Sequence, residues 1–158
     1  MTLIRERKAA DATADPKGEA VADLVLEAAQ FFFRMRAVGR RMGLFTRWGG
    51  GAFGFMRSLA LIGPLTVAQI AAMRPVSRQR MQRLANELAK ERLVEFVDNP
   101  RHRRSKLVRL TTKGEARFRQ LNARFLAVSA TMGAGLNATD IRKAAEILQR
   151  LGEEARGR

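Results

Sequence analysis

The sequence predicts a mainly α-helical protein: a winged helix-turn-helix with long N- and C-terminal dimerisation helices and a two-stranded wing. Three observations predict this fold class. Residues 65–92 give a short helix pattern, a turn and a longer helix pattern, and two β-rich runs around an arginine-rich loop follow. Residues 65–111 carry eleven Lys and Arg against four acids. Apolar residues on both sides of this segment step by three and four, as in helices that pack on partners.

Composition limits the classes of protein and partner. A chain of 158 residues with 46% hydrophobic residues is long enough for one domain with a true core. The net charge of +15 favours a polyanion, with nucleic acid ahead of an anionic membrane, although a role in solubility is the alternative. The excess charge is uneven: +7 over residues 65–111, against +1, +3 and +4 over residues 1–17, 18–64 and 112–158.

The absence of cysteine excludes disulfides, thiolate metal sites and cysteine-based sensing. It fits a reducing compartment, so we expect a cytoplasmic protein. The first residues contain no apolar stretch of the kind found in a signal peptide, and no uncharged run is suited to crossing a bilayer. No membrane association is therefore expected.

Four regions are expected along the chain. Residues 1–17 read as a flexible basic tail, with a minor-groove arm as the alternative. Residues 18–61 form N-terminal helices for dimerisation and support. Residues 62–111 form the winged helix-turn-helix, and residues 112–158 form C-terminal dimerisation helices.

The N-terminal region begins with a long helix pattern. Its apolar positions from Val21 to Met42 alternate steps of three and four, and a run of three phenylalanines widens the apolar face. A glycine-rich stretch over 49–54 formally matches G-x-G-x-x-G, but it follows no strand and lacks the acid that a dinucleotide site requires. A hinge or close helix packing is the better interpretation. A second helix then ends at Gly63 and Pro64.

The helix-turn-helix has clear start and stop signals. Thr66 and Gln69 form a T-x-x-Q capping box for a short helix, Pro75 makes the turn, and Ser77 caps the longer helix 77–92. One face of that helix is apolar, which leaves the opposite face polar. The apolar face consists of Met81, Leu84, Ala85 and Leu88.

Two short β-rich runs, residues 93–97 and 107–111, flank the loop 98–106 and predict a hairpin wing. After the wing, Thr112 and Glu115 resemble a capping box for a fifth helix. Asn137 or Thr139 is expected to cap the last helix.

Two groups of polar side chains are candidates for binding DNA. Gln and Asn can pair with adenine and Arg with guanine, whereas clustered loop cations are most easily explained by nearby phosphates. The alternatives are a solvated helix face and a solvated basic loop. On the helix the candidates are Ser77, Arg78, Gln79, Gln82, Arg83 and Asn86. On the wing they are Arg101, Arg103, Arg104 and Lys106.

Signals for an enzyme are weak. The chain has no Cys, no Tyr and a single histidine, His102, which lies among arginines where a metal ligand or general base is not expected. We therefore expect no catalytic residues, no metal site and no cofactor.

The stretch from Ser77 to Gly114 resembles the MarR family of bacterial winged-helix transcription regulators. MQRLANELAKERLVEF is similar to the family's recognition helix and first wing strand, and DNPRHRRSKLVRLTTKG is similar to its wing. Val108, Leu110, Thr111 and Gly114 fit the V-x-L-T-x-x-G ending, and Arg104 matches the wing arginine. His102 stands where the family often has Asp, which puts in doubt the acid–arginine clasp that stiffens the wing.

The resemblance implies a homodimer that binds a pseudo-palindromic operator, with one helix in a major groove and one wing in the adjoining minor groove. Many family members are repressors released by a small aromatic ligand. The residues that could form such a pocket are Phe32, Phe33, Met35, Trp48 and Phe55, with an ordinary core role as the alternative. A low-specificity architectural DNA-binding protein and an RNA-binding module remain alternative functions.

Overall fold

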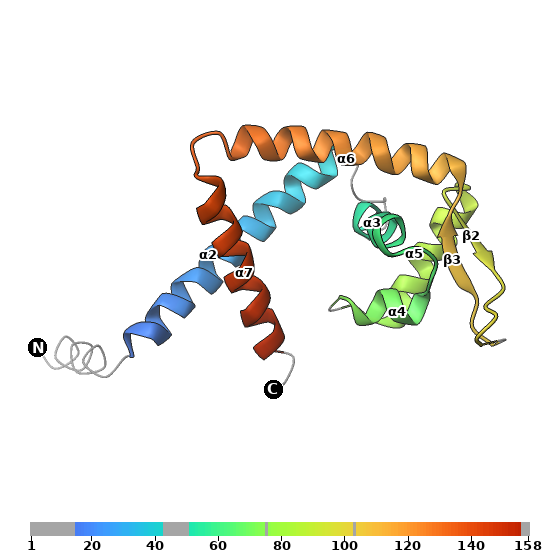
Figure 1. Cartoon of the computed structure of the whole chain (residues 1–158), viewed down its shortest axis with the longest axis horizontal. Coiled ribbons are helices and arrows are strands. Elements are labelled where there is room, and N and C mark those ends of the chain that lie inside the picture. The colour runs from blue at the N-terminus through green and yellow to red at the C-terminus, as the bar shows by residue number, and fades with distance from the viewer. Residues whose placement is uncertain (1–14, 43–50, 75, 103, 156–158) are drawn as a thin grey trace, which may run out of the picture. The chain divides into compact units, whose positions relative to one another are not determined.

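The computed structural model describes residues 15–42, 51–74, 76–102 and 104–155. It divides into two compact units, Met1–Phe45 and Thr46–Arg158, and each is described by itself. Helix α2 belongs to the first unit, and the other elements belong to the second (Figure 1). The elements are α2 (Pro16–Arg41), α3 (Ala52–Ile62), β1 (Leu65–Thr66), α4 (Val67–Ala72), α5 (Arg78–Lys90), β2 (Val94–Val97), β3 (Leu107–Leu110), α6 (Thr112–Met132) and α7 (Ala138–Glu154). The expected winged helix-turn-helix is confirmed.

Helix α2 begins earlier than the sequence pattern predicts. Asp15 is the N-cap, and its side chain accepts a 3.2 Å hydrogen bond from the backbone N–H of Lys17. Proline suits the first helical position because its missing N–H would have no partner there. The tail expected over residues 1–17 was therefore too long at its end, and residues 1–14 lie outside the described part of the chain.

The core of the second unit lies where α3, α4, α5, α6 and the sheet meet. Phe53 of α3 packs against two aromatic rings of α6, at centroid distances of 5.7 Å to Phe118 and 5.2 Å to Phe125. Both rings of α6 lie in the region expected to contribute to the dimer, and here they pack against α3 within the chain. The largest fully buried side chains are Phe55, Met56, Ile70, Leu88, Val94, Val108 and Leu121.

The helix-turn-helix starts with the caps that the sequence predicts. Thr66 and Gln69 form a reciprocal capping box at α4, and the Ser77 hydroxyl accepts from the backbone N–H of Arg80 at α5. The apolar face of α5 is buried as expected, with Ala85 fully inaccessible. Burial of this face anchors α5 and leaves its polar face outward.

The wing belongs to a three-stranded antiparallel sheet with the order β1-β3-β2. The expected hairpin is β2 and β3, in which Phe96 pairs with Val108. The third strand, β1, was not expected: Leu65 pairs with Val108 and Thr66 with Leu107. Because Thr66 is also the N-cap of α4, the base of the wing is joined directly to the start of the helix-turn-helix.

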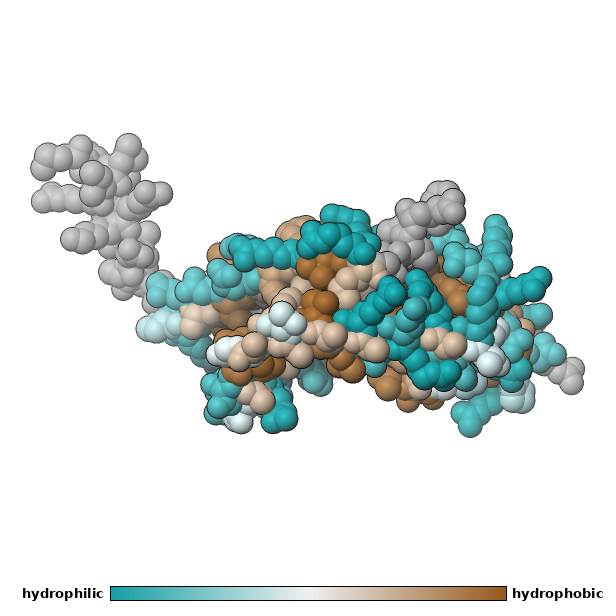
Figure 2. Space-filling model, turned by 90° about the horizontal axis from the view of Figure 1, so that it is seen from above, coloured by the Kyte–Doolittle hydropathy of each residue, from teal (hydrophilic) through white to brown (hydrophobic). Residues whose placement is uncertain are grey.

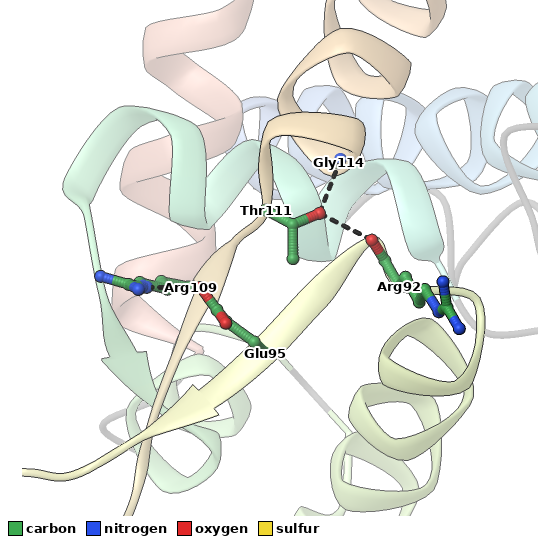
Figure 3. A network of polar contacts seen from close by, with 5 residues as sticks. All are labelled: Arg92, Glu95, Arg109, Thr111 and Gly114. Carbon is green, nitrogen blue, oxygen red and sulfur yellow. Dashed lines mark hydrogen bonds and ion pairs between the residues drawn. The ribbon is translucent and has the colours of Figure 1, made fainter.

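Thr111 caps α6, so the capping box expected at Thr112 and Glu115 was wrong. The Thr111 hydroxyl accepts a 3.0 Å bond from the backbone N–H of Gly114 (Figure 3). Thr111 continues directly from β3 with an extended backbone, and this geometry starts the helix one residue earlier than the pattern indicated. Asn137 caps α7, accepting from the N–H of Thr139, as one of the two expected alternatives.

Helix α7 has no buried residue. Its apolar face is open to solvent together with apolar residues near the end of α6, and hydrophobic patches are visible at the surface in the space-filling view (Figure 2). The exposed apolar residues of this region are Leu126, Met132, Leu136, Ile141, Ile147 and Leu148. None of the helices in the described part of the chain has the length and hydropathy needed to span a membrane.

Candidate nucleic-acid interface

The polar face of α5 is presented to solvent by the buried face beneath it. Gln82 is half-buried, and its side-chain amide donates a 3.0 Å hydrogen bond to Oδ1 of Asn86. This contact holds the two amides in a shared orientation. It leaves the Gln82 Oε1, the second Gln82 N–H and the Asn86 NH₂ for another partner. The remaining candidates of this helix are exposed: Ser77, Arg78, Gln79 and Arg83.

The wing loop is held by Asn99. Its Oδ1 accepts a 3.0 Å bond from the backbone N–H of Arg101, and its Nδ2 donates to the Ser105 hydroxyl at 3.4 Å. Two backbone bonds, from His102 N–H to the Asn99 carbonyl and from Ser105 N–H to the His102 carbonyl, close the loop further. An asparagine therefore orders this wing, which has His102 where an acid was expected. Arg101, Arg104 and Lys106 are exposed, and Arg103 lies outside the described residues.

Two adjoining hollows lie between the start of the helix-turn-helix and the wing. The smaller, of 240 Å³, brings Arg78 and Gln82 together with Arg104 and Lys106. The larger, of 750 Å³, brings Arg78 together with Arg101. The two share the lining residues Thr66, Ala68, Arg78 and Ser105. No acidic residue is among the described residues that line either hollow, so both favour an anion.

Only some of the predicted DNA-binding residues line these two hollows. Gln79, Arg83 and Asn86 lie on the polar face of α5 but do not line the hollows. Conversely, Thr66, Ala68 and Gln69 of the β1–α4 region line the larger hollow and were not expected there. The capping box predicted their local structure, but no sequence pattern indicated that the wing would fold against them.

One arginine of the wing already has a partner. Arg109 on β3 donates a 2.8 Å bond to Glu95 at the paired position on β2 (Figure 3). Both side chains are about half exposed, so the ion pair contributes little to stability. It does tie the two wing strands across their outer face and reduces the charge available to a ligand there.

The turn of the helix-turn-helix is tied to α3 by Arg74. Its guanidinium donates to the carbonyl of Gly54 and, at 3.0 Å, to the hydroxyl of Ser58. Burial, with a further contribution from Arg57, lowers the pKa of Arg74 below its ordinary value. Gly54 permits this approach, because a Cβ at that position would overlap the guanidinium.

The residues suggested for an aromatic-ligand pocket are dispersed among different environments. Phe55 is fully buried in the core of the second unit. Phe32 and Phe33 are exposed on α2 in the first unit, with ring centroids 5.9 Å apart, and Met35 is half-buried there. Trp48 lies outside the described residues. The pocket therefore remains a prediction.

Comparison with known proteins agrees with this geometry. Residues 50–105, which run from the start of α3 into the wing loop, match the family model described as MarR family. The winged-helix region of this chain is therefore similar to that of MarR-family proteins. Uncharacterized proteins of Mycobacterium bovis and Mycobacterium tuberculosis are 32% identical over 87 residues, which is 55% of this chain. The chain spans 61% of the length of these curated relatives.

Solved MarR-family structures share the fold at low sequence identity. A MarR family transcription regulator is 23% identical with a TM-score of 0.72, covering 89% of this chain and 93% of its own. The PcaV transcriptional regulator from Streptomyces coelicolor, solved with its natural ligand, is 18% identical with a TM-score of 0.69, covering 81% and 90%. A mutant MarR from E. coli complexed with operator DNA is 20% identical with a TM-score of 0.66, covering 87% and 99%. In this shared fold, α5 corresponds to the second helix of the helix-turn-helix and the β2–β3 hairpin to the wing.

Proposed function

We propose that the protein is a sequence-specific, double-stranded-DNA-binding transcription regulator. Helix 77–92 reads the major groove, and the wing 98–106 contacts the minor groove and the backbone. One observation carries the proposal: Arg78 and Gln82 from the recognition helix share a hollow with Arg104 and Lys106 from the wing. A surface that joins base-reading amides and unopposed cations suits a duplex.

The two elements have different roles in this proposal. Arg78, Gln79 and Gln82 lie in the first two turns of α5, the part of a recognition helix that meets base edges. The wing offers only cations and one histidine as long polar side chains at its tip, so it supplies mainly sequence-independent affinity. The Ser77 cap keeps the first turn of α5 intact at the point of contact.

We further propose that the protein acts as a homodimer on a pseudo-palindromic operator. The exposed apolar residues of α6 and α7 form more uncovered apolar surface than scattered single residues would, and a two-fold contact would bury them. The exposed phenylalanines of α2 supply a second apolar surface for the same purpose.

The regulatory part of the proposal is a repressor that a small aromatic ligand releases from DNA. The support is the similarity to MarR-family proteins together with the candidate aromatic residues of α2 and α3. A small ligand can release a repressor only if it binds the DNA-free conformation more tightly than the DNA-bound one. Titration of the protein–operator complex with simple phenolic acids tests this part separately.

The DNA-binding proposal is tested by fluorescence anisotropy on the full chain at physiological salt. The probes are a duplex selected from a random library, a random duplex and an RNA of equal length. A regulator should prefer the selected duplex by about 10³ or more. Equal affinity for both duplexes would indicate an architectural protein, and preference for RNA would indicate an RNA-binding module. Arg104→Ala should weaken binding. Arg150→Ala on α7 makes the same change in charge outside the proposed DNA-binding surface, so it should leave binding unchanged.

A further inference from the structure

Gln69 lies on α4, outside both the recognition helix and the wing, yet it lines the larger hollow between them. Its neighbours in the lining include Arg78 from the first turn of α5 and Arg101 from the wing loop. Both arginines are exposed and neither has an acidic neighbour in the lining. The hollow is therefore a cationic site built from three separate elements.

The capping box fixes the orientation of the Gln69 carboxamide. Its Oε1 accepts two hydrogen bonds from Thr66, 2.8 Å from the backbone N–H and 3.0 Å from the hydroxyl. Because both bonds use the oxygen, the amide NH₂ faces away from Thr66. That NH₂ has no hydrogen-bond partner within the described part of the chain, so a residue in the lining of the hollow keeps two donors free for a ligand beside the two cations.

The ligand that this arrangement suits is a phosphate. In a duplex, the major groove and the adjoining minor groove are separated by one sugar–phosphate strand. A protein with α5 in one groove and the wing in the other must therefore receive that strand between them, where the hollow lies. Neutral amide donors and arginines commonly share such backbone contacts.

We propose that Gln69 donates a hydrogen bond from its side-chain amide to a phosphate of the strand that crosses between the recognition helix and the wing, with Arg78 and Arg101 neutralising its charge. This inference rests on the proposed function and deepens it. Gln69 is then a positioning residue, which sets how α5 sits in its groove and reads no base.

The variant that isolates the contact is Gln69→Glu. A glutamate preserves the acceptor oxygens of the capping box, since T-x-x-E is equally a capping box, so helix α4 and the thermal midpoint should be retained. It removes the NH₂ donor and places a negative charge at the phosphate. Affinity for duplex should fall about tenfold or more, the order expected when a hydrogen bond to a charged group is lost and repulsion is added.

The matched control is Gln120→Glu on α6. It makes the same change of group and charge, and its acceptor oxygen also has a partner, Arg117 at 2.7 Å. It lies in the lining of neither hollow. Duplex affinity of this control should stay within about twofold of wild type, which separates a contact at the hollow from a general change in net charge.

Three measurements complete the test on the full chain. The loss in Gln69→Glu should be equal for selected and random duplexes, because a phosphate carries no sequence information. Arg78→Gln should lower the salt slope by about 0.9, whereas Gln69→Ala should leave it unchanged. The double variant Gln69→Ala with Arg78→Gln should show non-additive losses, as expected of two side chains on one phosphate.

The proposal is overturned if Gln69→Glu and Gln120→Glu bind duplex equally well, or if the loss in Gln69→Glu is confined to the selected duplex. In the second case Gln69 would read bases. Failure of the wild-type chain to bind any duplex would instead overturn the proposed function itself, so the two failures are distinguishable.

Discussion

The hydroxyl of Thr111 donates a 2.6 Å hydrogen bond to the carbonyl oxygen of Arg92, which joins the start of α6 to the corner between α5 and β2 (Figure 3). Arg92 has a positive φ of 58°, a conformation that non-glycine residues rarely adopt. Lys113 adds a 2.8 Å bond to the carbonyl of Glu91, and the Thr111 N–H bonds the carbonyl of Leu93. The end of the recognition helix is thus held by the first turn of the long C-terminal helix.

Thr111→Val should destabilise the protein, because it removes both the cap on Gly114 and the bond to Arg92. We expect a loss of about 1–2 kcal/mol in the free energy of unfolding. Thr112→Val is the matched control, since Thr112 is exposed and makes no side-chain bond in the described structure. It should change stability by less than about 0.5 kcal/mol. Urea unfolding of both variants decides which threonine caps α6.

Gly114→Ala should destabilise the protein, although a Gly-to-Ala change within a helix normally stabilises it. A Cβ at Gly114 would overlap the carbonyl oxygen of Leu93, so the contact between α6 and the residue that precedes β2 must open. The expected loss is about 1–3 kcal/mol. Gly152→Ala on α7 is the control, because its added Cβ meets nothing and should stabilise the helix by about 0.5–1 kcal/mol. A lower thermal midpoint for Gly114→Ala and a higher one for Gly152→Ala would support this account. A higher midpoint for both variants would contradict the close contact at Gly114.

Arg74→Lys should loosen the turn between α4 and α5. Both bonds, to the Gly54 carbonyl and the Ser58 hydroxyl, leave the guanidinium nitrogen Nη2, which lies one bond further along the side chain than a lysine ammonium would. We expect a cost of about 1–3 kcal/mol in unfolding free energy. Arg57→Lys is the control, because Arg57 is exposed on α3, the helix that carries Gly54 and Ser58, and its side chain makes no hydrogen bond within the described residues. If both variants unfold at the same urea concentration, Arg74 does not hold the turn.

The sequence was most informative where structure is local. The capping box of Thr66 and Gln69, the Ser77 cap and the apolar face of α5 depend on spacings within a few residues, and all three are present. A strand of two residues such as β1 has no alternation to detect, so Leu65 and Thr66 were read only as the approach to a helix.

Contacts between distant residues could not be predicted in this way. Arg74 reaches a carbonyl 20 residues earlier, and Thr111 reaches one 19 residues earlier. The identity of the α6 cap depended on the second of these contacts, because Thr111 and Thr112 are chemically alike. The place of Gln69 in the candidate site likewise required knowledge of how the wing folds against α4.

Leu148→Glu should weaken the proposed dimer. Leu148 is exposed on the apolar face of α7, where burial against a second copy would exclude a charge. The sedimentation coefficient should shift toward the monomer at micromolar protein. Lys143→Glu lies on the opposite face of the helix and makes the larger change in charge, yet it should leave the dimer intact. Equal behaviour of the two variants would place the dimer contact elsewhere.

The last prediction concerns base reading by α5. Gln79 is exposed in the first turn and makes no hydrogen bond within the described residues, so its amide is free to pair with a base edge. Gln79→Ala should lose about 1–3 kcal/mol of discrimination at the base that it reads. Since the side chain is outside the core, the urea midpoint should not change. In a symmetric dimer the loss should appear at two matched positions of a pseudo-palindrome.

Those two positions should lie about one helical turn apart, roughly 10–10.5 base pairs, or a multiple of that spacing. Selection from a random duplex library by wild type and by Gln79→Ala measures this directly. Lys90→Ala is the control at the far end of the same helix: it removes a cation, so it should reduce affinity without altering the preferred sequence. If wild type and Gln79→Ala select the same sites, Gln79 reads no base. In that case discrimination must come from other side chains of α5, such as the paired amides of Gln82 and Asn86 or the exposed Arg78, or from the shape of the DNA.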